Sequence, residues 1–329
     1  MAILKPDDQA AARQLQAGDP DVNILAYMDY ASARSYDGDK SVVSVSFEEA
    51  KANDWLARDT NGNLIEWGGY PGHYMTKVWD PGYQRAWVER AKEVAAEGVF
   101  DGIFADNAMY TLSHYNNAIM AGASSPEESD ARIRAGILDL ARQAGEALEG
   151  SGHSLMTNIS DGRLDPEWWK ALSRYGGGME ENFANWGRAD TPTVYDWGPG
   201  GWQDQVDLFE MNENPSVAIT FAQEGDTRTA LYGYTSFLMT ARPGDGWEVN
   251  FGNGSTKTAE QSIPLGAPRG KHVNSNGIRS REFDGGWAAV NPTDQAVTVQ
   301  VPAGMVDASG NAVSSITLQP RSGAVLSRS

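Results

Sequence analysis

The sequence predicts an α/β protein, a (β/α)8 TIM barrel followed by a small C-terminal antiparallel β-sandwich. Apolar runs alternate with segments of helical periodicity over the first four fifths of the chain, which is typical of βα repeats. Beyond them the chain turns to short strands and turn residues. With 329 residues, 40% of them hydrophobic, it can form a barrel of about 250 residues and a small second domain. We expect the catalytic barrel at 1–262 and the sandwich at 263–329.

The first half of the barrel shows apolar runs that end in acidic or amide residues. The predicted strands are residues 1–4, 22–29, 75–80 and 102–107, and the predicted helices are residues 7–16 and 81–98. Residues 1–4 are short for a barrel strand, so we expect the first strand to be truncated at the N-terminus. Residues 30–74 are rich in glycine, aspartate and aromatic residues, and are expected to be irregular with a small hairpin.

The second half continues the alternation. Helices are predicted at 126–149, 166–173, 200–212 and 227–239, and strands at 154–159, 177–183, 216–223 and 247–251. A glycine-rich nucleotide loop does not follow any of these strands in the sequence, which disfavours an open dinucleotide-binding sheet. Eight strands alternating with helices favour a barrel.

The C-terminal segment reads as an all-β domain. Short strands are predicted at 278–283, 286–291, 296–301, 315–318 and 324–326, with turn residues between them. From residue 265 on, basic residues outnumber acidic ones by six to four, although the net charge of the whole chain is −18. The acidity therefore belongs to the predicted barrel.

Charge and composition narrow the partners. Phosphates and anionic membranes are bound by clustered Lys and Arg, so a charge of −18 argues against nucleic acid and membrane partners and favours neutral or cationic substrates. Cysteine is absent and the four histidines show no metal-ligand spacing, so we expect no metal and no cofactor. The first residues contain no export signal, and an upstream region could supply one. An extracellular or virion-associated protein is the expectation.

Acidic strand ends supply the candidate catalytic pair. The carboxyl ends of barrel strands converge on one face, and glycosidic bond hydrolysis needs one carboxyl group as acid and another as nucleophile or base. Asp106 ends one predicted strand and Glu181 another. Because side chains alternate along a strand, only one of Glu180 and Glu181 can face the interior. We favour Glu181 as the acid and assign Glu180 to substrate binding.

Other polar and aromatic residues near strand ends form the predicted substrate-binding set. Aromatic rings stack on sugar faces while polar groups bind hydroxyls. An acid at such a position can equally be the cap of the next helix, so both interpretations stay open for any one of them. The set is Asp29, Tyr27, Trp79, Asp80, Asn107, Asn158, Glu180, Trp186 and Gln223.

These motifs resemble known families. DGIFADN at 101–107, YMD at 27–29, WDP at 79–81 and MEENF at 179–183 look like the hypothetical glycosyl-hydrolase-like TIM-barrel families. They are similar to the endo-α-1,4-polygalactosaminidase family and, more distantly, to the α-galactosidase clan. The resemblance implies a catalytic Asp on the fourth strand and a catalytic Glu on the sixth, which match Asp106 and Glu181. It also implies that the first strand begins before Met1 and that a small β-sandwich follows the barrel.

The predicted function is a glycoside hydrolase that cleaves a bacterial or fungal cell-wall or capsular polysaccharide. The alternative is a carbohydrate-binding barrel without catalysis. A separation of about 5 Å between the two carboxyl groups would indicate retention of configuration, and about 6.5–9.5 Å inversion. The sequence leaves the sugar, the linkage, endo or exo action and the oligomeric state open.

Overall fold

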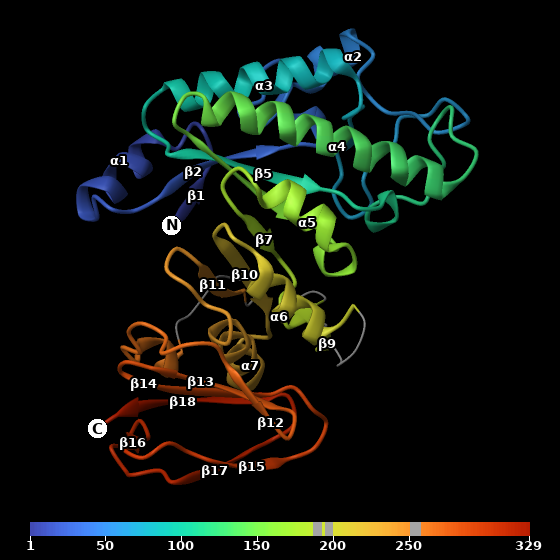
Figure 1. Ribbon diagram of the computed structural model, residues 1–329. Helices are drawn as coiled ribbons and strands as arrows, with labels where there is room; N and C mark the ends of the chain where they lie inside the picture. Colours follow the sequence, from blue (N-terminus) through green and yellow to red (C-terminus); the bar gives the residue numbers. More distant parts are fainter. Residues whose placement is uncertain (187–192, 195–199, 251–257) are drawn as a thin grey trace. The chain divides into compact units, whose positions relative to one another are not determined.

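The computed structural model describes residues 1–186, 193–194, 200–250 and 258–329 (Figure 1). The chain forms two compact units. Unit 1 consists of Met1–Asp161 and Glu167–Gly178, and unit 2 of Gly162–Pro166 and Met179–Ser329. The predicted boundary between residues 262 and 263 stays a prediction.

Unit 1 contains a parallel sheet whose strands follow the chain. Strands β1 (Ala2–Leu4), β2 (Ile24–Asp29), β5 (Gly102–Ala108) and β6 (Ser154–Ile159) are hydrogen-bonded neighbours in that order. Doubly wound sheets reverse this order at a switch point, whereas barrel-type sheets do not. Within unit 1 the topology therefore agrees with a barrel, and the closure of the barrel stays a prediction.

Helices α3 (Pro81–Ala96) and α4 (Pro126–Glu149) run side by side over this sheet (Figure 1). The α4 helix begins where Ser125 accepts the N–H of Glu128, and its buried stripe recurs at helical spacing, as predicted. Gly136 allows close packing, because a Cβ there would lie 2.7 Å from the backbone nitrogen of Trp79. This contact fixes the loop before α3 against α4.

One predicted barrel strand is wrong. In place of a strand at 75–80, β4 (His73–Met75) pairs antiparallel with β3 (Ser32–Arg34), and β2 pairs directly with β5. Asp80 ends the loop and caps α3, since its carboxylate accepts the N–H groups of Gly82 at 2.7 Å and Tyr83 at 3.2 Å. The cap and the Pro that follows it are typical of a helix start. Asp106 therefore lies near the end of the third parallel strand, where the fourth was expected.

The parallel strands of unit 2 agree with the predicted positions. Strands β10 (Ser216–Phe221) and β11 (Gly246–Asn250) form a parallel pair joined through α7 (Thr227–Leu238). Strand β7 (Gly178–Glu180) is shorter than the predicted 177–183. The remaining α-helices and strands described before residue 263 are α1 (Gln9–Gly18), α2 (Phe47–Ala52), α5 (Pro166–Ser173), α6 (Trp202–Met211), β8 (Asn185–Trp186) and β9 (Thr193–Val194).

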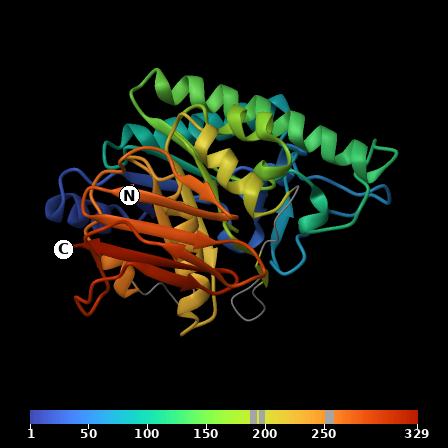
Figure 2. The same cartoon turned by 60° about the horizontal axis from the view of Figure 1, so that its bottom comes forward.

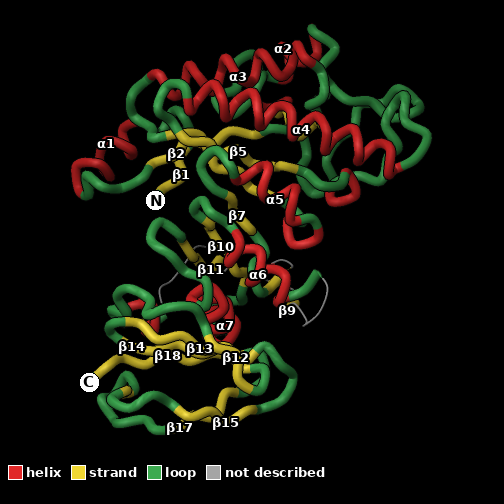
Figure 3. The backbone as a smooth tube through the Cα atoms, viewed as in Figure 1, coloured by secondary structure: helices red, strands yellow, loops and turns green. Residues whose placement is uncertain are grey.

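The C-terminal segment forms the expected antiparallel sheets, which Figures 2 and 3 show as adjacent strands. One sheet has the order β12-β13-β14-β18-β16, and β15 pairs with β17. Their bounds are β12 (Val273–Ser275), β13 (Ile278–Phe283), β14 (Gly286–Asn291), β15 (Val297–Gln300), β16 (Met305–Val306), β17 (Ser315–Leu318) and β18 (Ser322–Arg328). A sandwich arrangement of these sheets stays a prediction.

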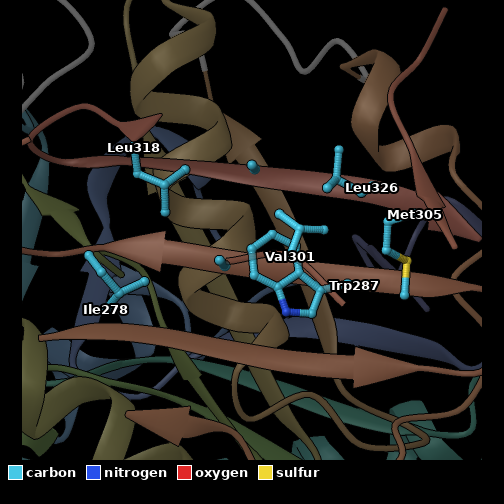
Figure 4. Packing of buried hydrophobic residues seen from close by; sticks show 8 residues of the cluster. Ile278, Trp287, Val301, Met305, Leu318 and Leu326 are labelled. Atoms are coloured by element: carbon cyan, nitrogen blue, oxygen red, sulfur yellow. The ribbon is translucent and has the colours of Figure 1, made fainter. Parts of the chain in front are cut away.

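A hydrophobic cluster around Trp287 fills one side of the larger sheet (Figure 4). Its other side packs against α7, and a Cβ at Gly323 would overlap the Thr235 side chain. Strand β14 is consequently buried at every position, with side chains covered on both faces. Within the described residues, we find no helix with the length and apolarity needed to cross a membrane.

Candidate active site

The candidate site lies at the carboxyl ends of β2 and β5. Asp29 and Asp106 are register partners on these adjacent parallel strands, and each closes an apolar run. Adjacent strands are about 4.8 Å apart, so the two carboxyl groups belong to one neighbourhood. The residues of this cluster all belong to unit 1.

Among the described residues, three groups donate hydrogen bonds to the Asp106 carboxylate. The Tyr27 hydroxyl lies 2.6 Å from Oδ2, and Oδ1 accepts from Asn158 Nδ2 and from the backbone nitrogen of Asn107, both at 2.8 Å. Tyr27, Asn158 and Asp106 itself come from neighbouring strands β2, β6 and β5. Donors of this kind stabilise negative charge on the carboxylate. The predicted residues Tyr27, Asn107 and Asn158 are thus brought together around Asp106.

Tyr27 acts as a donor because it keeps its proton. Burial raises the pKa of its hydroxyl, and the charges of Asp29 and Asp106 raise it further. The Arg34 guanidinium lies 5.6 Å from the centre of the Tyr27 ring and donates to its oxygen at 3.2 Å. Arg34 was not in the predicted set, and its place on the antiparallel strand β3 explains why a barrel pattern missed it.

Asn107 adopts an unusual backbone conformation. Its φ is +63°, in the left-handed region, which Asn tolerates better than most residues. The β5–β6 register shifts between Ala105 and Ala108, so the strand is irregular at this point. The Asn107 side chain donates to Asp29 Oδ2 at 3.0 Å and accepts from the Tyr115 hydroxyl at 2.9 Å. It links Asp106, Asp29 and Tyr115.

Asp29 is a buried carboxylate with an exposed fraction of 0%. In the described part of the chain, Oδ1 accepts the backbone N–H groups of Ala31 and Ser32, both at 2.9 Å. Oδ2 accepts from the Ser32 hydroxyl at 2.7 Å and from Asn107 Nδ2. Burial and the charge of Asp106 raise the pKa of Asp29 to about 6, although the Ser32 hydroxyl, the Ala31 N–H and the charge of Arg34 act in the opposite direction. A residue so covered fits a supporting role better than direct contact with substrate.

An aromatic cluster extends from Tyr115 towards solvent. The rings of Trp67 and Tyr115 stack, with 4.2 Å between their centroids and 5° between their planes. The Tyr70 ring meets the Tyr115 ring edge-on, with 5.6 Å between the centroids. His73 lies 5.6 Å from the Tyr36 ring and 5.7 Å from the Tyr70 ring. Tyr36 and Tyr70 are 61% and 48% exposed. Tyr36 and Tyr70 were not in the predicted set because residues 30–74 have no regular period, although their density of aromatic residues was visible.

His73 connects this cluster to Asp29. Its Nδ1 lies 3.2 Å from the Ser32 hydroxyl, and its Nε2 lies 2.6 Å from the Tyr36 hydroxyl. Burial and the nearby charge of Arg34 lower the pKa of His73. A neutral ring suits this chain of hydrogen bonds, with one ring nitrogen donating to Ser32 and the other accepting from Tyr36.

The other predicted residues have different surroundings. Asp80 uses its carboxylate as the α3 cap, and Trp79 lies beside Arg132, whose guanidinium is 5.8 Å from the ring centre. In unit 2, Glu180 is 2% exposed at the end of β7, and Glu181 follows it as an exposed residue. Gln223 is exposed after β10. The Trp186 side chain lies outside the described part of the structure.

Metal ligands do not cluster in the described ranges 1–186, 193–194, 200–250 and 258–329: no three His, Asp or Glu side chains there are grouped to hold an ion. The described cluster presents the Asp106 carboxylate with its donors beside the buried carboxylate of Asp29.

The fold is similar to that of solved glycosidases. One is a family 31 dextranase from Flavobacterium johnsoniae in complex with isomaltotriose, at 12% identity, a TM-score of 0.53, and coverage of 97% of this chain and 44% of that one. Another is a family 31 sulfoquinovosidase from E. rectale in complex with an aza-sugar inhibitor, at 13% identity and a TM-score of 0.52, with coverage of 98% of this chain and 53% of that one. A third is an α-amylase from Malbranchea cinnamomea, at 12% identity and a TM-score of 0.50, with coverage of 98% of this chain and 77% of that one. The chain thus spans about half the length of the two family 31 enzymes.

At such low identity these neighbours show the fold alone. Among curated proteins, no sequence matches the chain. The finer resemblances to the polygalactosaminidase family and the α-galactosidase clan stay predictions. A family model described as hypothetical glycosyl hydrolase family 15 matches residues 16–287, which is most of the chain. The protein belongs to this hypothetical glycosyl hydrolase family.

Proposed function

We propose that the protein is a glycoside hydrolase that cleaves a polysaccharide, with Asp106 as nucleophile or general base. The observation that carries this proposal is the set of three donors among the described residues, two of them from neighbouring strands, around a half-buried Asp106. They stabilise a negative carboxylate at the end of a parallel strand, where barrel enzymes keep their catalytic groups. Membership in a glycosyl hydrolase family supports the same reaction class.

The second carboxyl group is proposed to come from the end of β7. Protonation of the leaving oxygen needs a carboxylic acid. Sequence alternation favours Glu181, and its exposed side chain is accessible to a substrate. Glu180 is the competing candidate, because it is the last residue of β7 and its side chain is 2% exposed. Separate Gln variants of the two residues distinguish them.

The substrate is proposed to be a neutral or cationic polysaccharide of a cell wall or capsule. The chain carries a net charge of −18, so polyanionic glycans are disfavoured. The exposed rings of Tyr36 and Tyr70 offer flat apolar faces on which pyranose rings stack. Polysaccharides of this kind lie outside cells, which supports an extracellular or virion-associated location.

A panel of bacterial and fungal polysaccharides tests the proposal. The protein is incubated with each glycan, and released oligosaccharides are separated and identified. We expect at least one glycan to be cleaved by the unaltered chain, with cleavage lost in the Asp106→Asn variant. Asp101→Asn is the matched control, because Asp101 lies at the opposite end of β5 and accepts the N–H of Ile24.

Two outcomes would contradict the proposal. Full activity of Asp106→Asn would remove Asp106 from the chemistry. Tight binding of a glycan without any product would favour the alternative of a carbohydrate-binding barrel without catalysis.

A further inference from the structure

We propose that Asp29 is a positioning residue: it holds Asn107 in the left-handed conformation that directs the Asn107 N–H at Asp106. The proposal rests on the proposed role of Asp106. It replaces the expectation that Asp29 binds substrate. It is carried by the burial of Asp29 and by its hydrogen bonds.

The burial of Asp29 separates it from any polysaccharide. Its side chain is 0% exposed, and its oxygens are occupied by the next turn of the chain and by Asn107. The bonds to Ala31 and Ser32 fix the carboxylate relative to β2. The bond to Asn107 then transmits that fixed position to β5.

Asn107 needs such a restraint. A non-glycine residue at φ +63° is held in a sparsely populated conformation, and the irregular β5–β6 register removes the regular ladder there. Its side chain is tied at both polar atoms, to Asp29 by Nδ2 and to the Tyr115 hydroxyl by Oδ1. Because χ and backbone are both constrained, the Asn107 N–H keeps its 2.8 Å contact with Asp106 Oδ1.

The chemistry of the ties predicts which substitutions can be tolerated. In Asp29→Ala, Asn107 Nδ2 loses its acceptor and the donors of Ala31 and Ser32 lose theirs. In Asp29→Asn, the Asn107 amide can flip so that its oxygen accepts from the new amide, while the Tyr115 hydroxyl turns from donor to acceptor. The conservative variant therefore keeps the tie through Tyr115, and the truncated variant does not.

The first measurement uses steady-state kinetics on the glycan that the panel identifies. For Asp29→Ala we expect kcat to fall about 10- to 100-fold with KM nearly unchanged, and for Asp29→Asn we expect most of kcat to return. Adding Tyr115→Phe to Asp29→Asn should cost more than adding it to the unaltered chain, because the flipped amide then has no acceptor. If Asp29→Asn were as inactive as Asp29→Ala, the charge of Asp29 would matter and the positioning role would be wrong.

Substitutions at Asn107 give a second test, because they disturb folding less than removal of the buried Asp29 carboxylate does. Glycine adopts positive φ without strain, whereas alanine does not. We expect Asn107→Gly to keep several-fold more kcat than Asn107→Ala. Equal activity of the two would show that the left-handed conformation is not what Asp29 preserves.

A crystal structure of Asp29→Ala separates this proposal from the proposed function. We expect residue 107 to leave the left-handed region and its nitrogen to move out of hydrogen-bond distance of Asp106. This outcome can be obtained even if Asp106→Asn proves active and the hydrolase proposal fails. An unchanged Asn107 in that structure would overturn the positioning role whatever the kinetics show.

Discussion

Two aspartates mark β5, Asp101 directly before its first residue and Asp106 near its last, and they differ in what surrounds them. At the beginning, Asp101 is exposed and accepts the N–H of Ile24 at 2.7 Å, which closes the first rung between β2 and β5. At the end, Asp106 collects donors from Tyr27, Asn107 and Asn158 and lies beside the buried Asp29. The same residue type thus links two strands at one position and accepts three hydrogen bonds from described residues at the other. In barrels, the amino ends of strands serve stability and the carboxyl ends serve catalysis.

The largest expected effect tests the end that holds Asp106. Asp106→Asn should lower the rate of glycan cleavage by about 10³-fold or more, since the charged group that attacks or activates water is gone. The melting temperature is measured alongside the rate. A rate within a few fold of the unaltered chain would erase the functional difference between the two ends of β5.

Glutamine variants at the end of β7 extend the comparison to a second strand. The variant that removes the acid should lose about 10²- to 10⁴-fold on natural glycans and much less on substrates with a good leaving group, which needs no proton. We expect this pattern for Glu181→Gln. Its appearance for Glu180→Gln alone would transfer the role to the buried residue.

The dependence of the free energy of unfolding on pH tests the raised pKa of the buried Asp29. The pKa of Asp29 is about 6 in the folded protein against 3.8 for a free aspartate, so the folded state binds more protons between these values. Its contribution to stability is therefore present at low pH and is lost as pH rises from about 4 to about 6, by on the order of 3 kcal/mol.

The measurement is denaturant unfolding of the unaltered chain and of Asp29→Asn from pH 4 to pH 7. Because the amide does not titrate, the variant should gain relative stability as pH rises. A difference between the two free energies that stays constant with pH would contradict the raised pKa.

Substrate affinity tests how far the site extends from Asp106. Tyr36→Ala and Tyr70→Ala should each raise KM by up to about 10-fold with kcat little changed, if each ring contributes about 1 kcal/mol of stacking to ground and transition state alike. Phenylalanine variants keep the ring and serve as controls. A fall in kcat at constant KM would instead place these tyrosines among the groups that shape the reacting centre.

The smallest effect is expected at the beginning of β5. Asp101→Asn keeps one acceptor oxygen, so the free energy of unfolding should fall by about 1 kcal/mol or less and the cleavage rate should stay the same. Chemical denaturation and the glycan assay measure the two quantities. A large loss of rate would show that the two ends of β5 are functionally coupled.

Long periodic segments were predictable from the sequence. The α4 helix has the predicted bounds because Ser125, Pro126 and the buried stripe all indicate the same element. Strands β2, β5 and β6 were found because they are apolar runs of six or seven residues. The run at 75–80 misled because an acid after apolar residues is common to strand ends and helix caps, and the competing cap geometry at Asp80 prevailed.

The site was predictable in part, for a physical reason. Tyr27, Asp106, Asn107 and Asn158 lie together, as the convergence of strand ends predicts, and their roles stay predictions. Arg34 belongs to the short antiparallel strand β3, and Tyr115 and the rings near His73 belong to segments between the parallel strands, whose course depends on tertiary contacts that no local pattern encodes. The burial of the Asp29 side chain was also not predictable, because a sequence gives the order of residues along a strand and not the extent to which other segments cover them.

The irregular register at Asn107 has a consequence for anyone who moves this site to another protein. In a regular strand, the side chains of neighbouring residues point to opposite faces, yet here Asp106 and Asn107 belong to one cluster. If these two residues were placed in a regular strand, one of the two side chains would point away from its hydrogen-bond partners. The unit to transfer is Asp106 and Asn107 together with the irregular strand that holds them, Asp29 and Tyr115.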